Sequence, residues 1–250
     1  MPLIANVFFM ARTSIIISGI ILVTAFMAVM AILVSFVTAG GDTPHKVGRI
    51  WAKCILALSN IRVTVKGLSN LKPGRSYIYM ANHMSNFDIP VLQAYLPVQF
   101  RWLAKAELYK IPIFGYAMKR AGYISIDRSD RESAIESLNK AVKIIRDGVS
   151  VIIFPEGTRS RTNTVQPFKK GGFFLAVDSG VPVIPIIIHG TGRIMPKKQM
   201  SIKPGNVTLE IEKPINSSDY TRKTKDDLME KVRGIMLKSF EKNYNNGILC

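Results

Sequence analysis

Charged residues are absent from a long stretch near the amino end of the chain, which is rich in Ile, Leu, Val, Met and Phe. The stretch runs from Thr13 to Gly41 and holds 29 residues. An α-helix rises about 1.5 Å per residue, so roughly 20 apolar residues cross the hydrocarbon core of a bilayer. The stretch is longer than the apolar part of a secretory signal, and no clear A-x-A-like cleavage site follows it. We therefore predict a membrane-inserted segment over residues 1–42.

Two arrangements of this segment fit the sequence, a single span and a re-entrant hairpin. Gly19 and the Gly40–Gly41 pair are possible break points. Arg12 is the lone basic residue before the apolar stretch, and three follow it closely: Lys46, Arg49 and Lys53. Because basic flanks stay on the cytoplasmic side, we expect the rest of the chain on the cytoplasmic face of the cell inner membrane.

Beyond the apolar stretch, period-2 alternation and short apolar runs predict strands, and 3.6-residue periodicity predicts helices. The predicted strands cover residues 61–66, 76–80, 100–104, 123–126, 149–154, 181–188 and 207–211, the last as an edge strand. The predicted helices cover residues 43–58 with Thr43 as N-cap, 111–120, 130–147, 172–179 and 224–240. This alternation indicates an α/β fold in which helices flank a central, largely buried sheet. We assign it to one domain over residues 43–250, a length that supports a single core.

The charge balance narrows the choice of partners. Lysine and arginine number 34 against 17 acidic residues, a formal net charge of +17. This excess favours an anionic partner, and the 48% hydrophobic content favours the membrane lipid bilayer among such partners. The basic residues are dispersed and no recognition motif is present, so nucleic-acid binding is not expected.

Cysteine and histidine are scarce, which limits the chemistry open to the chain. Cys54 and Cys250 are the only cysteines, and the only histidines are His45, His83 and His189. No cluster has the spacing of a metal site, and no G-x-S-x-G sequence indicates a serine hydrolase. We therefore expect no metal and no cofactor.

Two segments at predicted strand ends carry candidate chemistry. Residues 82–88 read Asn-His-Met-Ser-Asn-Phe-Asp. Asp88 can fix the tautomer of His83 and leave the other ring nitrogen as a general base. The same residues also fit a purely structural interpretation, in which His83 is buried in the core and Asp88 caps a helix. Residues 154–160 read Phe-Pro-Glu-Gly-Thr-Arg-Ser, where exposed amides and Arg159 can bind phosphate or form an ordinary turn.

Together with residues 122–128 and 181–186, these segments resemble, in order, motifs one to four of the glycerolipid acyltransferase superfamily. The likeness is closest to the bacterial-type 1-acyl-sn-glycerol-3-phosphate acyltransferases. Residues 82–88 are similar to the NHxxxxD signature and residues 154–160 to the FPEGTRS motif. The resemblance covers about Ile61 to Thr191.

The resemblance implies an acyl transfer and a role for each motif residue. The acyl chain would pass from acyl-CoA or acyl carrier protein to the sn-2 hydroxyl of lysophosphatidic acid, giving phosphatidic acid. His83 would deprotonate this hydroxyl, and Asp88 would orient His83. The apolar fourth motif and the membrane segment would line the acyl path. Substrate-binding roles fall on Asn82, Lys105, Arg128, Glu156, Gly157, Thr158 and Arg159. Arg159 and Arg128 would hold the acceptor's phosphate, Glu156 would order its loop or bind the glycerol part, and Lys105 would bind phosphate or stabilise the oxyanion.

Two other functions remain open at this point. The same chemistry could serve another lysolipid or glycerol 3-phosphate, since the acceptor is not specified by the motifs. The second alternative is a lipid-binding protein without catalytic activity. The presence of His83, Asp88 and Arg159 together argues against it, because binding alone requires no base.

Overall fold

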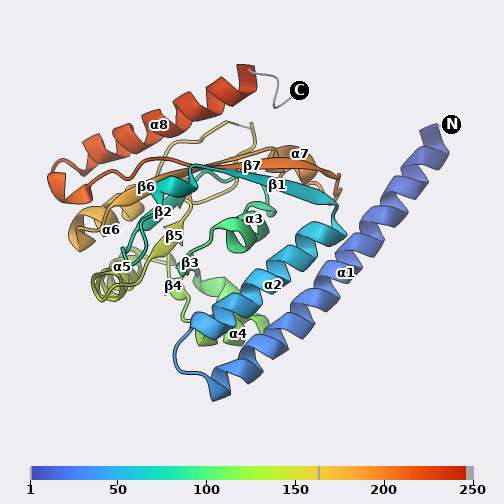
Figure 1. Cartoon of the computed structure of the whole chain (residues 1–250), viewed down its shortest axis with the longest axis horizontal. Coiled ribbons are helices and arrows are strands. Elements are labelled where there is room, and N and C mark those ends of the chain that lie inside the picture. Colours follow the sequence, from blue (N-terminus) through green and yellow to red (C-terminus); the bar gives the residue numbers. More distant parts are fainter. Residues whose placement is uncertain (1, 163, 246–250) are drawn as a thin grey trace.

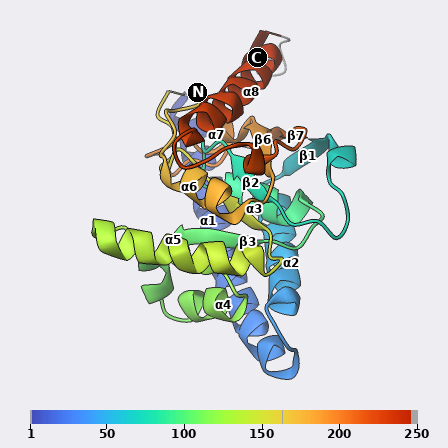
Figure 2. The same cartoon turned by 90° about the vertical axis from the view of Figure 1, so that its left-hand side faces the viewer.

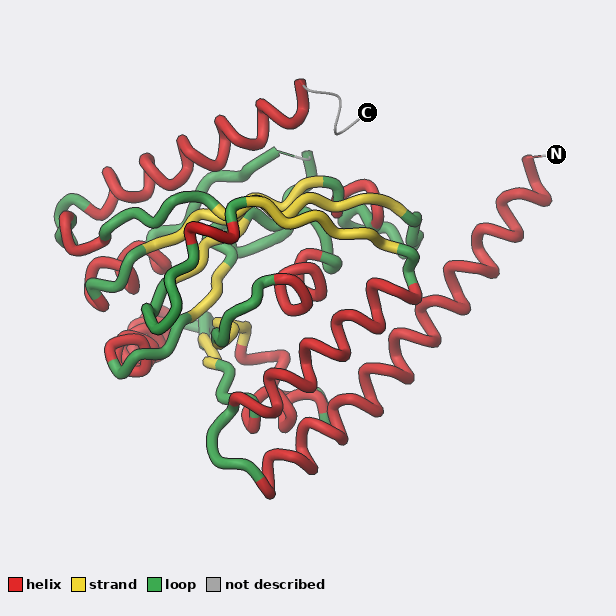
Figure 3. Tube along the Cα trace, viewed as in Figure 1, coloured by secondary structure: helices red, strands yellow, loops and turns green. Residues whose placement is uncertain are grey.

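A seven-stranded sheet with helices on both faces forms the body of the molecule (Figures 1 and 3). The computed structural model describes residues 2–162 and 164–245, so Cys250 lies outside the described residues. The order across the sheet is β1-β7-β6-β2-β5-β3-β4. The strands are β1 (Ile61–Lys66), β2 (Ile78–Ala81), β3 (Arg101–Lys105), β4 (Ile124–Ile126), β5 (Val151–Ile153), β6 (Val183–His189) and β7 (Gly205–Ile211). The predicted α/β fold is confirmed.

Strand β2 lies in the middle of the sheet and pairs in parallel with β5 on one side and β6 on the other. Every residue of these three strands is buried, because helices cover both faces of the sheet. All other pairings are parallel except that of β6 with β7. The carboxyl ends of β2, β5 and β6 therefore meet at one edge of the sheet.

The helices form two layers, one on each face of the sheet. Helices α2 and α3 pack in one apolar core with Tyr79 of β2, and α5, α6 and α8 pack in the other with Met80. Figure 1 shows α8 and α5 across the strands from α2, and Figure 2 shows α5 and α6 from the side facing the viewer. The bounds are α2 (Asp42–Leu58), α3 (Asp88–Tyr95), α4 (Phe114–Arg120), α5 (Arg131–Arg146), α6 (Gly171–Ser179), α7 (Thr191–Ile194) and α8 (Lys225–Asn245). Three short 3-10 helices are η1 (Leu68–Asn70), η2 (Ala106–Lys110) and η3 (Ser217–Asp219).

Helix α1 (Pro2–Val37) is continuous, so the possible break at Gly19 is not used. The break at the Gly40–Gly41 pair is confirmed: the chain turns there, with a φ of +73° at Gly40, and returns as α2 alongside α1 (Figure 1). Within the described residues, Val7–Val37 is the one helix long and apolar enough to cross a membrane, and 17% of its most apolar window is buried against the protein. The apolar segment thus presents most of its surface outward.

Two sequence predictions about the elements are wrong. Helix α2 begins at Asp42 with Gly41 as its N-cap, so Thr43 is already inside the helix. Strand β7 is not an edge strand, because β1 pairs on its outer side. Its sequence still alternates, since Val207 and Leu209 face a core while the side chains between them are only partly covered.

Candidate active site

The sheet edge where β2, β5 and β6 end brings together two of the four motifs. His83 follows β2, and Glu156 and Gly157 follow β5 in a turn closed by the bond from Gly157 N–H to the Phe154 carbonyl, 3.0 Å. Thr191 follows β6 as the first residue of α7. Parallel strands deliver their carboxyl ends to the same edge, which is where open α/β sheets hold their sites. Local strand endings thus place a histidine, a glutamate and a threonine beside one another.

Asp88 is fully buried at the start of α3 and holds the histidine loop. Its Oδ2 lies 2.7 Å from His83 Nδ1 and accepts the backbone N–H groups of Met84 at 2.7 Å and Ser85 at 2.8 Å. Its Oδ1 accepts the Thr191 hydroxyl at 2.5 Å. A carboxylate held by these donors fixes the Nδ1–H tautomer of His83 and leaves Nε2 to accept a proton.

The imidazole of His83 is also fixed in orientation. Its ring stacks on Phe154 with centroids 3.9 Å apart and planes 9° apart. The side chain is 14% exposed and borders the cavity described below. The pairing with Asp88 predicted from the five-residue spacing is therefore present, with the ring held in one plane beside open space.

Both backbone groups of His83, its N–H and its carbonyl, are hydrogen-bonded to the loop after β5. Glu156 Oε1 accepts the His83 N–H at 2.7 Å, and Glu156 Oε2 accepts the Gln166 N–H at 3.0 Å. The Ser160 N–H donates to the His83 carbonyl at 2.7 Å. Glu156 is 2% exposed, so both of its oxygens are used inside the protein rather than at its surface. This residue joins the first motif to the third.

Burial raises the pKa of Glu156 to about 7, against the lowering effect of its two backbone donors. A carboxyl whose pKa rises on folding binds its proton more tightly in the folded state. Its stabilising contribution is complete below about pH 4.5 and is lost as the pH rises to about 7, a change of roughly 3 kcal/mol. Thermal melts from pH 5 to 8 should show this fall in wild type and not in Glu156→Gln. Parallel pH profiles for the two proteins would contradict the assignment.

Asn82 has a fully buried side chain whose two ends are both bonded. Its Nδ2 donates to the Ile188 carbonyl at 3.0 Å, and its Oδ1 accepts the Ile188 N–H at 2.7 Å. The amide thus extends the pairing of β2 with β6 by one side chain. Asn82, predicted to bind substrate, is placed where it holds His83 at the strand end.

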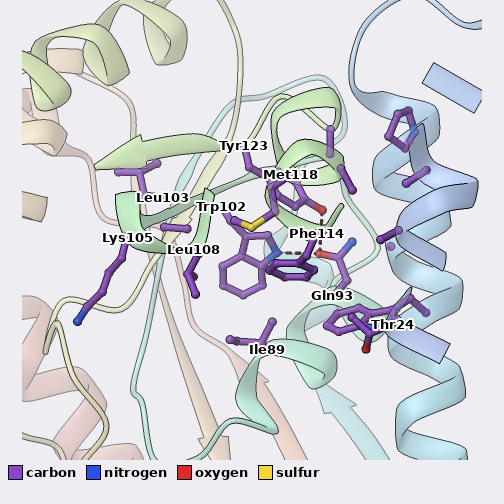
Figure 4. A pocket seen from close by; sticks show the side chains of 18 of the residues that line it. Thr24, Ile89, Gln93, Trp102, Leu103, Lys105, Leu108, Phe114, Met118 and Tyr123 are labelled. Atoms are coloured by element: carbon purple, nitrogen blue, oxygen red, sulfur yellow. Dashed lines mark hydrogen bonds between the residues drawn. The ribbon is translucent and has the colours of Figure 1, made fainter. Parts of the chain in front are cut away.

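A mostly apolar cavity of about 280 Å³ opens beside His83. Helix α1 contributes Thr24 and Met27, α2 contributes Trp51, and α4 contributes Met118. In Figure 4, Lys105 lies on one side of the labelled group and Thr24 on the other. Gln93 lies among the apolar side chains, where its Oε1 accepts Trp102 Nε1–H at 2.8 Å. The arrangement suits a long apolar ligand whose reacting end lies at His83.

The predicted cationic residues divide between two places. Lys105 and Arg128 border the cavity with Gly157, where an added Cβ would lie 3.5 Å from Arg128 Nη1. Thr158 and Arg159 are not among the described residues that line the cavity. They continue the same loop, where Lys197 Nζ donates to Thr158 Oγ1 at 3.2 Å and to the Arg159 carbonyl at 2.5 Å. Positive charge therefore lies on both sides of the Gly157 turn.

The other two histidines lie in the core. Burial, with Arg101 and Arg49 nearby, lowers the pKa of His45 to about 3. His189 stacks on Phe240 of α8 and lies 3.4 Å from the Glu210 carboxylate. These contacts give His189 a structural role, and His83 is the histidine that borders the cavity.

Sequence reasoning missed three residues of the site. Thr191 holds Asp88, Gln166 holds Glu156, and Lys197 holds the loop at Thr158 and Arg159. The position of Thr191 three residues after the predicted strand 181–188 was the one usable signal. Within the described residues, no group of three or more His, Cys, Asp or Glu side chains could hold a metal ion.

Comparison with known proteins gives one family. A family model described as Acyltransferase matches residues 62–189. The chain is 36% identical over 176 residues to the chloroplastic 1-acyl-sn-glycerol-3-phosphate acyltransferase BAT2 of Brassica napus, covering 70% of this chain and 51% of that protein. It is 31% identical over 223 residues to the human 1-acyl-sn-glycerol-3-phosphate acyltransferase alpha, covering 89% and 79%. The chain spans about half the length of the chloroplastic relatives.

A solved structure extends the likeness to nearly the whole chain. The crystal structure of the 1-acyl-sn-glycerophosphate (LPA) acyltransferase PlsC from Thermotoga maritima superposes with a TM-score of 0.80 at 27% sequence identity. The match covers 97% of each chain, and so includes the amino-terminal helices as well as the sheet.

Proposed function

This chain belongs to the acyltransferase family, and on that premise we propose that it acylates the sn-2 hydroxyl of 1-acyl-sn-glycerol 3-phosphate. The acyl donor is a thioester, acyl-CoA or acyl carrier protein, and the product is phosphatidic acid. The relatives named above carry this acceptor in their names. The observation that supports the proposal most is the His83–Asp88 pair at the rim of an apolar cavity bordered by Lys105 and Arg128.

The proposed reaction uses one base and no covalent acyl-enzyme. His83 Nε2 takes the proton of the acceptor hydroxyl as its oxygen attacks the thioester carbonyl. The new C–O bond forms, the C–S bond breaks, and the departing thiolate takes the proton from the His83 imidazolium. Asp88 stabilises the imidazolium through Nδ1, at 2.7 Å. The buried contacts of Glu156 and Ser160 keep the histidine in place during both transfers.

The acceptor's phosphate binds above the Gly157 turn in this proposal. Arg128 borders the cavity beside Gly157, and Arg159 follows Gly157 by two residues in the same loop, so we assign both guanidinium groups to this one phosphate. Lys105 adds a third positive charge at the cavity rim. Gly157 has a φ of +71°, and an added Cβ there would lie 3.0 Å from Lys169 Cδ and 3.5 Å from Arg128 Nη1, so a glycine lets two cationic side chains approach the turn.

The acyl chain occupies the apolar cavity in this proposal. Met27 and Ala31 of α1 form part of its wall, in agreement with the prediction that the membrane segment lines the acyl path. The fourth motif makes no such contribution among the described lining residues. Its residues from Val183 onward form the buried strand β6 at the centre of the sheet, so the motif serves the core.

Membrane association follows from the outward apolar surface of α1, and we propose that the catalytic domain lies on the cytoplasmic face of the inner membrane. The basic residues after α1 favour that side. We keep the proposed division into a membrane segment over residues 1–42 and a catalytic domain over 43–250. Trp51 Nε1–H donates to Thr24 Oγ1 at 2.9 Å, so the two parts are tightly packed.

The activity is tested with purified protein in mixed micelles. Both thioester donors are offered with lysophosphatidate, other lysophospholipids and glycerol 3-phosphate, and products are identified by mass spectrometry. Phosphatidic acid formed from lysophosphatidate at the highest kcat/KM supports the proposal. A preference for an acceptor without a terminal phosphate would replace it with lysophospholipid remodelling.

Leu22→Asp should weaken membrane binding without disturbing the fold. Leu22 is 71% exposed on α1, so its side chain has few protein contacts to lose. A charge in the bilayer costs most at its centre and little at its surface, so we expect about a tenfold lower partition into vesicles. Vesicle flotation at high salt measures the effect. Ile135→Asp, at 48% exposure on α5, is the matched control and should float as wild type does. Equal flotation of all three proteins would place the anchor elsewhere.

A further inference from the structure

Three consecutive apolar residues are exposed between η2 and α4. Ile111 and Ile113 are 46% and 49% exposed, and Pro112 between them is exposed as well. Leu108 and Tyr116, on either side, are 37% and 45% exposed. Single exposed apolar residues are ordinary, but a contiguous run of large ones marks a contact surface. We call residues 108–116 the apolar turn.

The apolar turn is firmly held in this exposed conformation. Ile113 has φ +62° and ψ −58°, and the Phe114 N–H donates to the Pro112 carbonyl at 2.6 Å. This is a γ-turn of the rare, strained kind, in a β-branched residue that disfavours positive φ. Gly115 packs closely on the backbone of Tyr109, where an added Cβ would lie 2.3 Å from the Tyr109 carbonyl oxygen. Only glycine therefore fits at this position of the turn. A strained backbone conformation that the surrounding contacts maintain often marks a functional segment.

Helix α4 connects the apolar turn to the membrane helix. Ala117 of α4 packs with Ala28 and Ala31 of α1. Arg120 Nη2 donates to the Ser35 carbonyl at 2.6 Å, and its guanidinium lies 5.0 Å from the centre of the Phe36 ring. Figure 1 shows α4 beside the lower ends of α1 and α2. The apolar turn is therefore followed directly by the helix that packs on the carboxyl-terminal part of α1.

The surroundings of the apolar turn match the chemistry of a lipid surface. Lys110 within the turn and Lys119 beyond its carboxyl end are both exposed. Apolar side chains with basic neighbours suit the boundary between acyl chains and anionic headgroups. Leu108 and Phe114 also line the cavity, so the turn forms part of the cavity rim.

We propose that the apolar turn is a second membrane contact, which inserts Ile111, Ile113 and Tyr116 into the headgroup boundary of the same leaflet that receives α1. The rim of the acyl cavity is thereby held at the surface of the bilayer. The inference concerns where the turn lies and is independent of the proposed acyl transfer.

Probe depth in vesicles tests the proposal on the full chain. Cys54 and Cys250 are replaced by alanine, and one cysteine is introduced at position 113, 116 or 135 for an environment-sensitive fluorophore. Position 116 lies within α4, away from the strained turn, and position 135 on α5 is the control of equal exposure. The vesicles carry anionic lipid with a spin label near the headgroup end of the acyl chain. We expect about twofold or stronger quenching at positions 113 and 116 and none at position 135.

Two outcomes overturn the proposal, and neither depends on turnover. Probes at 113 and 116 that emit like the probe at 135, without quenching, would leave the turn in water. A blue shift at 113 and 116 that needs no lipid and rises with protein concentration would mean that a second copy of the chain covers the turn.

Discussion

Alanine at position 83 is expected to lower kcat for acyl transfer by about 10²–10⁴-fold, the contribution typical of a general base. The side chain is lost, but the fold should remain, because Glu156 and Ser160 hold the backbone of residue 83 rather than its ring. Initial rates with lysophosphatidate and a thioester donor measure the loss. Melting temperature and vesicle flotation, both expected unchanged, show that the protein is intact.

Added imidazole provides the control for this variant. Removal of the ring leaves a slot against Phe154, which stacks on His83 in the wild type. Free imidazole can enter this slot and accept the proton, so it should restore part of the rate to His83→Ala and none to wild type. Asp88→Asn should also be slow, but it also weakens the contacts to Met84 and Ser85 and should melt earlier. Near-normal specific activity of His83→Ala would refute the base assignment.

Lysine in place of Arg159 or Arg128 should raise the KM for lysophosphatidate by about 10- to 150-fold, since a charge-assisted contact contributes roughly 1.5–3 kcal/mol. Lysine keeps the charge but cannot form the two parallel bonds of a guanidinium with phosphate. The KM for the thioester donor should stay near the wild-type value. Steady-state kinetics with each substrate varied in turn separates the two constants.

A double substitution decides whether the two arginines bind one phosphate. If both do, the effects of Arg128→Lys and Arg159→Lys on the acceptor KM are coupled and do not add. Arg161→Lys, an exposed residue of the same loop, is the matched control and should leave both constants unchanged. A rise in the donor KM with Arg159→Lys would instead place that arginine on the phosphates of coenzyme A.

Elements specified by nearby residues were predicted well from the sequence. Strand β1 has the predicted bounds, and α5 begins after Asp130, whose Oδ1 accepts the Ser133 N–H at 2.8 Å. The wrong predictions concern elements whose structure depends on residues far away in the sequence. The alternation of β7 is that of an edge strand, and only the pairing with β1, far earlier in the chain, shows otherwise. Glycine at position 19 can break a helix, but α1 continues because it packs along α2.

In the candidate site, too, the contacts between nearby residues were predicted and those between distant residues were not. His83 and Asp88 are five residues apart, so one turn brings them together and the spacing indicates the pair. Glu156 is 73 residues from His83, and Thr191 is 103 residues from Asp88. No periodicity connects residues at such separations. Asn82 was assigned to substrate and Glu156 was left between ordering its loop and binding glycerol for that reason, whereas the contacts of both side chains are with the protein backbone.

The central position of β2 determines when the site can form during synthesis. Its neighbours β5 and β6 begin at Val151 and Val183, so the strand before His83 has no partner until most of the chain has been made. Such long-range pairings form slowly, because the intervening chain must first be brought together. Helix α1 is made first and needs no sheet partner. We therefore expect the nascent chain to reach the bilayer before His83 is in place.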